Sequence, residues 1–300
     1  MLDRDTYGKT KPYKMKKTLS ILVLSILSFS FSWSQDLENS LLWEVSGNGL
    51  EQSSYIFGTI HMTCDASLDD KVKLALDNTS LLVLELDMDD PSMNTAMMQN
   101  MAMKDNQKMK LLLSDEEYAE LDAFIQSKFN APLNAFETFK PFFLSAMLAT
   151  KFLDCPVQSF EAELVKVSKE QEEEVLGLET VEEQLNIFDE IPYQDQIDDL
   201  MVSISDDLAK DKVKFQKISE YYKTSNLVGI QELTDEDDTL TMSKYKNLLL
   251  TNRNKNWISK IASFAKEQPT FFGVGAAHLI GDEGVIQLLR KQGFTVTAVK

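Results

Sequence analysis

One short apolar run limits the fold of this chain more than any other feature. Residues 81–86 read LLVLEL, and they follow a helical pattern that extends from Asp69 to Asn78. An apolar run of this length is typical of a buried strand. A helix that leads directly into a buried strand is the signature of an α/β protein.

Similar patterns along the chain predict the other elements. Strands are expected at Leu41–Val45 and Tyr55–Ile60, joined by a turn over 46–49, and at Glu174–Glu179, Thr270–Val274 and Phe294–Val299. Helices are expected at Ser92–Met109, Tyr118–Phe129, Lys140–Leu153, Phe160–Gln171 and Gly284–Gln292, and over most of Val181–Ser263 with breaks near Pro192 and 233–238. We therefore predict an α/β (α+β) fold, with a central mixed β-sheet, flanking helices and a large helical insertion around 92–155 and 181–265, in a single domain over 35–300.

The first 34 residues have the layout of an N-terminal extension followed by a signal peptide. A basic segment at Lys14–Lys17 precedes an apolar run from Leu19 to Phe31, and cleavage is expected near Ser34. The run is shorter than the roughly 20 residues that span a membrane, and no later segment is long and apolar enough. We expect a secreted or periplasmic protein whose mature chain has no membrane span.

The charge of the chain argues against nucleic acid as a partner. The net charge is −18. Removal of residues 1–34 takes away six basic and two acidic residues, which brings it to −22. A phosphate backbone would be repelled by such a chain, so we expect no binding to nucleic acid.

The chain has two cysteines, Cys64 and Cys155. An oxidising compartment permits a disulfide and an even count permits complete pairing, so we expect a Cys64–Cys155 bridge. The bridge would tie the loop after His61 to the segment before the next predicted strand. The alternatives are two free thiols, or Cys64 as a thiolate ligand three residues from His61.

The two histidines of the chain close similar GxxH motifs. Residues 58–61 read GTIH and residues 275–278 read GAAH, each at the end of a predicted strand. Ligands gather at strand ends, and histidine is both the commonest metal ligand and a frequent acid–base group. A lone histidine is more often a surface residue or a satisfied core group, but the matched contexts predict that His61 and His278 share one functional site.

Two carboxylates, Glu85 and Glu179, lie at the ends of other predicted strands. Taken singly, each is an ordinary residue at a sheet edge. Together with His61 and His278 they form a plausible set of ligands for zinc, manganese or cobalt. No HExxH run of a zincin is present, so the set would differ from that type of metal site.

An ordered set of motifs resembles the TraB/GumN family. The resemblance rests on GTIH at 58–61, VLELD at 83–87, KPF at 140–142, GLET at 177–180 with Gln184, Arg253-Asn254 before Trp257, and VGAAHL at 274–279 with Gly281, Gly284 and Val285. It covers essentially the whole mature chain. The resemblance implies an erythromycin-esterase/ChaN-like core, similarity to the Tiki metalloproteases, and a divalent metal, with manganese or cobalt preferred.

The resemblance also implies roles for individual residues. His61 and His278 would be metal ligands or direct catalytic groups, and Glu85 or Glu179 would be a ligand or the general base. Arg253 would stabilise an oxyanion or anchor a substrate carboxylate. Asn254 would orient a ligand, or else bond a neighbouring loop as an ordinary helix residue.

Two functional hypotheses follow. The first is a secreted metal-dependent hydrolase, a peptidase that cleaves peptides or protein N-termini through a metal-activated water. The second is a non-catalytic exported binding protein that captures a signalling peptide, or a metal or heme-like ligand, in the same cleft. Turnover of a peptide would distinguish them.

Overall fold

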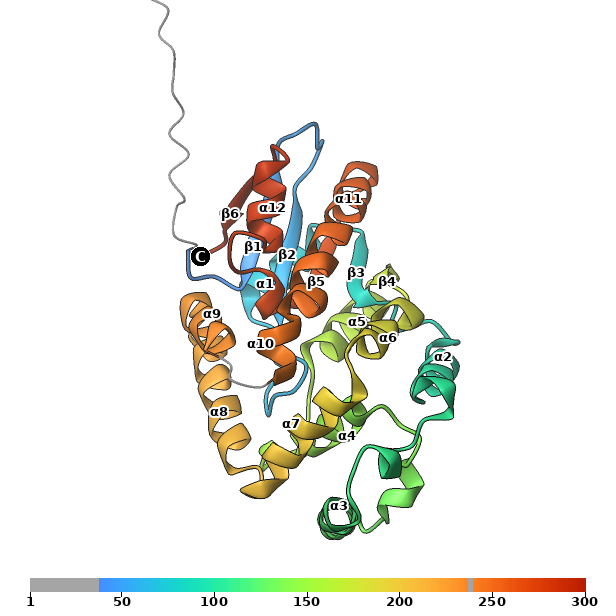
Figure 1. Cartoon of the computed structure of the whole chain (residues 1–300). Coiled ribbons are helices and arrows are strands. Elements are labelled where there is room, and N and C mark those ends of the chain that lie inside the picture. Colours follow the sequence, from blue (N-terminus) through green and yellow to red (C-terminus); the bar gives the residue numbers. More distant parts are fainter. Residues whose placement is uncertain (1–37, 237–239) are drawn as a thin grey trace, which may run out of the picture. The chain divides into compact units, whose positions relative to one another are not determined.

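The computed structural model describes residues 38–236 and 240–300 (Figure 1). The predicted signal peptide lies outside the described residues. Within them the sheet has six strands: β1 (Leu42–Ser46), β2 (Ser54–Thr59), β3 (Leu81–Leu86), β4 (Glu174–Glu179), β5 (Phe271–Gly275) and β6 (Thr295–Ala298).

The strand order is β4-β3-β5-β2-β1-β6. The four strands β4, β3, β5 and β2 run parallel to one another, while β1 is antiparallel to both β2 and β6. The predicted α/β class with a mixed sheet is therefore confirmed. The finer expectation of an erythromycin-esterase/ChaN-like core stays a prediction.

The β1–β2 hairpin turns where the sequence places two glycines. Gly47, Asn48 and Gly49 have φ angles of 74°, 49° and 85°. Glycine adopts this left-handed region without a steric penalty, and asparagine tolerates it better than most residues. The turn sets the register of the two strands, with Leu42 opposite Phe57.

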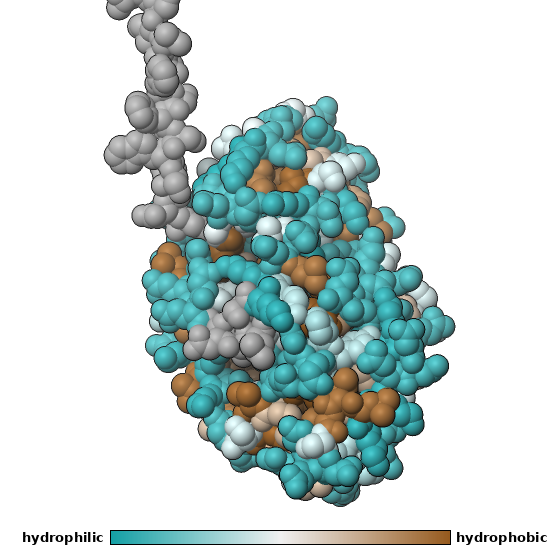
Figure 2. Space-filling view, viewed as in Figure 1, coloured by the Kyte–Doolittle hydropathy of each residue, from teal (hydrophilic) through white to brown (hydrophobic). Residues whose placement is uncertain are grey.

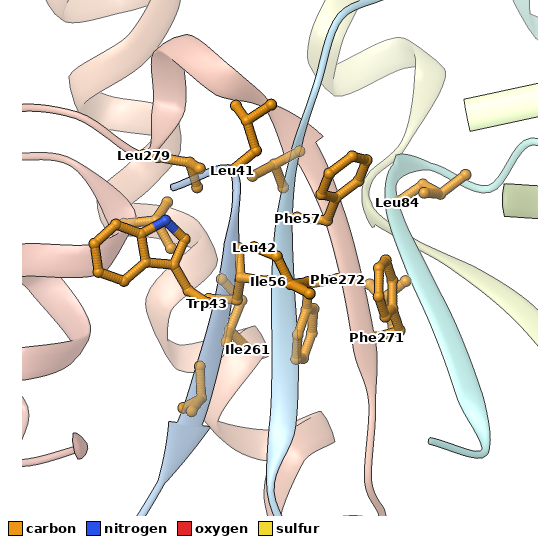
Figure 3. Packing of buried hydrophobic residues seen from close by; sticks show 14 of the residues in the cluster. Leu41, Leu42, Trp43, Ile56, Phe57, Leu84, Ile261, Phe271, Phe272 and Leu279 are labelled. Carbon is orange, nitrogen blue, oxygen red and sulfur yellow. The ribbon is translucent and has the colours of Figure 1, made fainter. Parts of the chain in front are cut away.

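A large apolar core fills the space around the central strands. Trp43, Ile56, Phe271 and Phe272 are each fully buried, and Figure 3 shows them on the neighbouring strands β1, β2 and β5, where Ile56 is the register partner of both Trp43 and Phe272. Every residue of β5 is buried. Continuous burial along a strand requires cover on both faces, which the helices around the sheet supply.

The helices are α1 (Asp70–Asp77), α2 (Met93–Asn100), α3 (Asp115–Phe129), α4 (Pro141–Ala149), α5 (Phe160–Glu170), α6 (Val181–Glu190), α7 (Tyr193–Ser205), α8 (Ala209–Lys223), α9 (Leu227–Asp235), α10 (Leu240–Lys246), α11 (Asn252–Glu267) and α12 (Val285–Lys291). Capping boxes begin two of them, at Ser114 for α3 and Thr180 for α6. Within 38–236 and 240–300, no helix has the length and apolar character that a membrane span needs.

The Met-rich segment is less helical than its sequence predicts. We expected one helix over Ser92–Met109, but α2 ends at Asn100 and two short 3₁₀ turns follow. Asp105 and Asn106 have φ angles of 57° and 51°, and Ala102 forms a bridge to Phe139. Left-handed residues and a strand-like bridge are incompatible with a continuous helix, so this part of the prediction is wrong.

The helical layer has an apolar core of its own, formed mainly by α3, α4 and α7. Figure 2 shows hydrophobic residues gathered on this face in the region where Figure 1 places α4 and α7. Beside this core Lys140 is 1% exposed, and its ammonium lies 3.0 Å from Asp189 Oδ2. The same ammonium donates to the carbonyls of Asn100 and Leu185, 2.7 and 3.0 Å away. One buried charge thereby joins α2, α4 and α6.

We predict that Lys140→Met lowers the free energy of unfolding by about 3 kcal/mol, because it leaves the buried Asp189 carboxylate without its closest cation. Urea denaturation measures the change. Lys210→Met is the control, since Lys210 is 87% exposed and its replacement should be nearly neutral. Equal effects of the two variants would show that the buried pair does not stabilise the layer.

The expected disulfide is present between Cys64 and Cys155. Next to it, Thr63 and Gln158 exchange two backbone hydrogen bonds of 2.9 Å each. The disulfide therefore fastens the loop after β2 to the segment that leads into α5. The alternatives of free thiols or a thiolate ligand at Cys64 do not apply to this structure.

The replacement of both cysteines by serine should lower the free energy of unfolding by about 4–5 kcal/mol, because the bridge closes a loop of 91 residues in the unfolded chain. Denaturation of the wild type with and without reductant gives the same comparison without mutation. Intact mass before and after reduction checks the bridge directly, and two free thiols in freshly exported protein would contradict it.

Candidate functional site

The predicted site residues come from the carboxyl ends of four adjacent parallel strands. In sheet order, Glu179 is the last residue of β4 and Glu85 the penultimate residue of β3. His278 closes the 3₁₀ turn directly after β5, and His61 lies two residues beyond β2. Parallel strands end at the same edge of a sheet, so the topology alone brings these four side chains together.

The absence of a side chain at Gly275 lets Glu85, His278 and His61 come close to the backbone at this position. A Cβ atom at this position would lie 3.3 Å from Glu85 Oε1, 3.5 Å from His278 Cδ2 and 3.8 Å from His61 Nε2. The N–H of Gly275 donates to Glu85 Oε1 at 2.8 Å. The glycine of the second GxxH motif is thus a backbone donor around which the two imidazoles and a carboxylate gather.

Arg253 of α11 is the central cation of the site. Its Nη2 donates to Glu85 Oε2 at 2.7 Å and to Glu179 Oε2 at 2.8 Å, and its Nε lies 3.1 Å from both oxygens of Glu179. Its Nη1 donates to the carbonyl of Leu249, inside a π-helical turn that leads into α11. The ring of Trp257 packs against the guanidinium at 4.8 Å. Both candidate glutamates therefore share one arginine.

His278 is buried and held on both sides. Asn254 donates from Nδ2 to the carbonyl of Glu283, which directs its Oδ1 to accept from His278 Nδ1 at 2.6 Å. His278 Nε2 accepts from Arg253 Nη1 at 3.2 Å and lies 3.8 Å from Glu85 Oε1. This pattern assigns the proton to Nδ1 and the lone pair to Nε2. Asn254 combines both expected roles, since it bonds a neighbouring loop and orients a histidine.

His61 is oriented by a residue that the sequence did not reveal. Glu161 of α5 is 8% exposed, and its Oε1 accepts from His61 Nδ1 at 2.8 Å and from the Thr59 hydroxyl at 2.6 Å. The His61 side chain is 69% exposed, and its Nε2 lies on the side of Gly275. The disulfide next to this pair brings the two segments together, and it was the one sequence signal that placed the region before α5 beside His61.

The pKa values of the two imidazoles are shifted in opposite directions. The hydrogen bond to Glu161 raises the pKa of His61 to about 9, against the smaller effect of burial. Burial lowers the pKa of His278 to about 3, against the attraction of Glu85. At neutral pH the chain therefore carries one charged and one neutral imidazole in the same site.

Glu85 stays ionised despite its burial. Burial alone raises the pKa of its carboxyl. The combined effect of His278, Arg253, His61 and the Gly275 N–H is larger and lowers the pKa to about 2. Since His278 is neutral at pH 7, the positive charges that remain near Glu85 are those of Arg253, in direct contact with it, and of His61. Gln184 adds a weaker hydrogen bond to Glu85 Oε2 at 3.3 Å.

The imidazoles and carboxylates of the site are groups that bind divalent cations. Each histidine donates a hydrogen bond from Nδ1 to an oxygen atom, as metal-binding histidines do, and the Nε2 atom of each lies on the side of Glu85. Across residues 38–236 and 240–300, however, no three His, Cys, Asp or Glu side chains lie close enough to form a ready metal site. Arg253 takes the contacts to Glu85, Glu179 and His278 that a metal ion would need.

The fold and the site together define a class of protein, an α/β chain with two GxxH histidines and two strand-end carboxylates around a buried arginine. The profile of the TraB/PrgY/gumN family matches residues 41–298, and the chain belongs to this family. The predicted resemblance is confirmed.

Two zebrafish relatives are similar to this chain over most of its length. Metalloprotease TIKI1 of Danio rerio is 22% identical over 317 residues, and Metalloprotease TIKI2 of the same organism is 20% identical over 322 residues. These alignments cover 86% and 88% of this chain but 63% and 61% of the relatives. The chain thus spans about three fifths of the length of the relatives. No solved structure matches.

We predict that the two histidines of the chain titrate far apart in NMR spectra of the metal-free protein. The His61 imidazole should stay charged to about pH 9, and that of His278 should stay neutral down to about pH 3. Glu161→Gln should lower the His61 pKa towards 6.5 and leave His278 unchanged, because it removes only the partner of His61. Two titrations near pH 6.5 in the wild type would refute this electrostatic description.

Proposed function

We propose that this protein is a metal-dependent hydrolase that cleaves peptides or protein N-termini. The observation that supports the proposal most strongly is the pair of histidines, each with Nδ1 held by an oxygen partner and each directed at the Glu85 carboxylate around Gly275. The likeness to proteins named as metalloproteases agrees with this reading. The proposed metals are manganese or cobalt, with zinc as an alternative.

The proposal assigns different roles to the two glutamates. His61, His278 and Glu85 would hold the metal, which would supply Lewis acidity to a water molecule and a substrate carbonyl. The pKa of Glu85, near 2, suits a ligand better than a general base, because a group this acidic rarely takes up a proton at neutral pH. Glu179 accepts hydrogen bonds from Arg253 on both oxygens, so its role in this scheme is to hold the arginine.

Arg253 would stabilise negative charge that develops on the substrate. Its guanidinium lines the same cavity as His61 and Glu85. A fixed cation in a partly buried site costs little reorganisation when the tetrahedral intermediate forms. The stacking of Trp257 and the hydrogen bonds that the guanidinium donates to both glutamates keep it in one orientation.

We also propose that the protein acts after export, as a secreted or periplasmic enzyme with a peptide or protein substrate. The Cys64–Cys155 disulfide is consistent with an oxidising compartment, because such bonds rarely persist in the cytosol.

We expect metal-dependent cleavage of a peptide library by the purified mature protein, with activity lost in His61→Ala and His278→Ala and after chelation. Mass spectrometry of the peptides and metal analysis of the same samples provide the measurement. Lys255→Ala is the matched control, because Lys255 lies on α11 near Arg253 but is half exposed and pairs only with Glu283 among the ion pairs of the described residues. Metal binding with every peptide left intact would favour the non-catalytic binding protein.

We predict that Arg253→Gln raises the affinity of the metal-free protein for Mn²⁺ by about tenfold. A unit charge a few ångströms from a cation site opposes metal binding by more than the 1.4 kcal/mol that this factor requires. Isothermal titration calorimetry measures the affinity, and circular dichroism checks the fold. Lys255→Gln should bind the metal as the wild type does. A weaker affinity in Arg253→Gln would mean that the arginine supports the metal site.

A further inference from the structure

The site opens into a cavity of about 410 Å³ whose walls differ in character. His61, Glu85, Glu161 and Arg253 are its only charged lining residues within the described part of the chain. These four groups pair with one another, His61 with Glu161 and Arg253 with Glu85. The charges of this polar wall therefore neutralise one another.

Most of the remaining lining is apolar, and a large part of it comes from the helical layer. Met93 and Met97 of α2, Phe143 of α4 and Phe188 of α6 pack together against the end of β3. All four line the cavity and are only half-buried, so each still presents surface to it. Phe142 stacks on Phe188 with ring centroids 3.6 Å apart, which closes this wall. We call Met93, Met97, Phe143 and Phe188 the apolar wall.

The apolar wall has the properties of a side-chain pocket. A volume near 410 Å³ lies within the range of small-ligand sites. The wall offers no charge partner, so a charged side chain placed there would lose hydration without compensation, whereas an apolar one gains about 25 cal/mol for each Å² it buries. Methionine side chains adapt to different shapes, which suits several bulky side chains over one.

We propose that this cavity binds a bulky apolar side chain, aliphatic or aromatic, of the peptide residue next to the bond that is cleaved. The proposal rests on the proposed hydrolase function, and it defines the substrate class. The cavity holds His61 and Arg253 at one wall and the apolar wall at the other, so one residue of a bound peptide contacts both. Peptides with Phe, Leu or Met at this position are the expected substrates, and those with Ala, Asp or Lys are poor ones.

The test compares two neighbouring methionines of α2. Met97→Trp fills the cavity, whereas Met98→Trp adds the same group at a side chain that is 75% exposed and does not line it. A position-scanned peptide library, read by mass spectrometry, gives the preference of each variant. We expect the wild type and Met98→Trp to favour Phe or Leu over Ala by about tenfold or more in kcat/KM, and Met97→Trp to lose most of that preference.

A binding measurement separates this proposal from the hydrolase proposal. In protein labelled at its methionine methyl groups, N-acetyl-phenylalanine amide should shift the resonances of Met93 and Met97 but not that of Met98, and N-acetyl-aspartate amide should shift none of them. This result would support the pocket even if no peptide were cleaved. Equal preference for all side chains in the library, equal effects of the two tryptophan variants, or no shift at Met93 and Met97 would overturn the pocket.

Discussion

The arrangement of side chains at the edge of the sheet depends on the contacts of one group, the guanidinium of Arg253. Glu85, Glu179 and His278 lie at the carboxyl ends of three different strands, and each contacts this one group. Two buried carboxylates side by side would repel each other and lose hydration, so the arrangement needs a cation between them. Trp257 of α11 and the Leu249 carbonyl of the preceding π-helical turn hold that cation in place. Sheet and helix are therefore joined through charge as well as through apolar packing.

The same arginine would compete with a metal ion for the atoms of the site. A divalent ion would need the carboxylate oxygens and the imidazole nitrogen that already accept hydrogen bonds from Arg253, and the guanidinium is part of the chain and cannot diffuse away. In the proposed metal-bound form Arg253 would give up its contacts to His278 and Glu85, and the charged imidazole of His61 would lose its Nε2 proton. Metal binding at the proposed site would thus be linked to pH and to the position of one side chain.

Much of the fold was predictable because its strands are short apolar runs that end in polar residues. The positions of His61, Glu85 and His278 at one edge follow from parallel strands alone. The partner Glu161 was not predictable, since its contact with His61 spans 100 residues and depends on the disulfide. The end of α2 at Asn100 and the π-helical turn before α11 depend on backbone angles that apolar spacing does not encode.

The position of β5 in the sheet has a consequence for the order in which the chain can fold. β5 pairs with both β2 and β3, yet it begins only at Phe271. A growing chain that has not reached this residue has the β1–β2 hairpin and the β3–β4 pair, with no strand to join them. Contacts this distant in sequence form slowly. Nearly the whole polypeptide must therefore be synthesised before the sheet can close, whereas the separate apolar core of the helical layer lies entirely before β5.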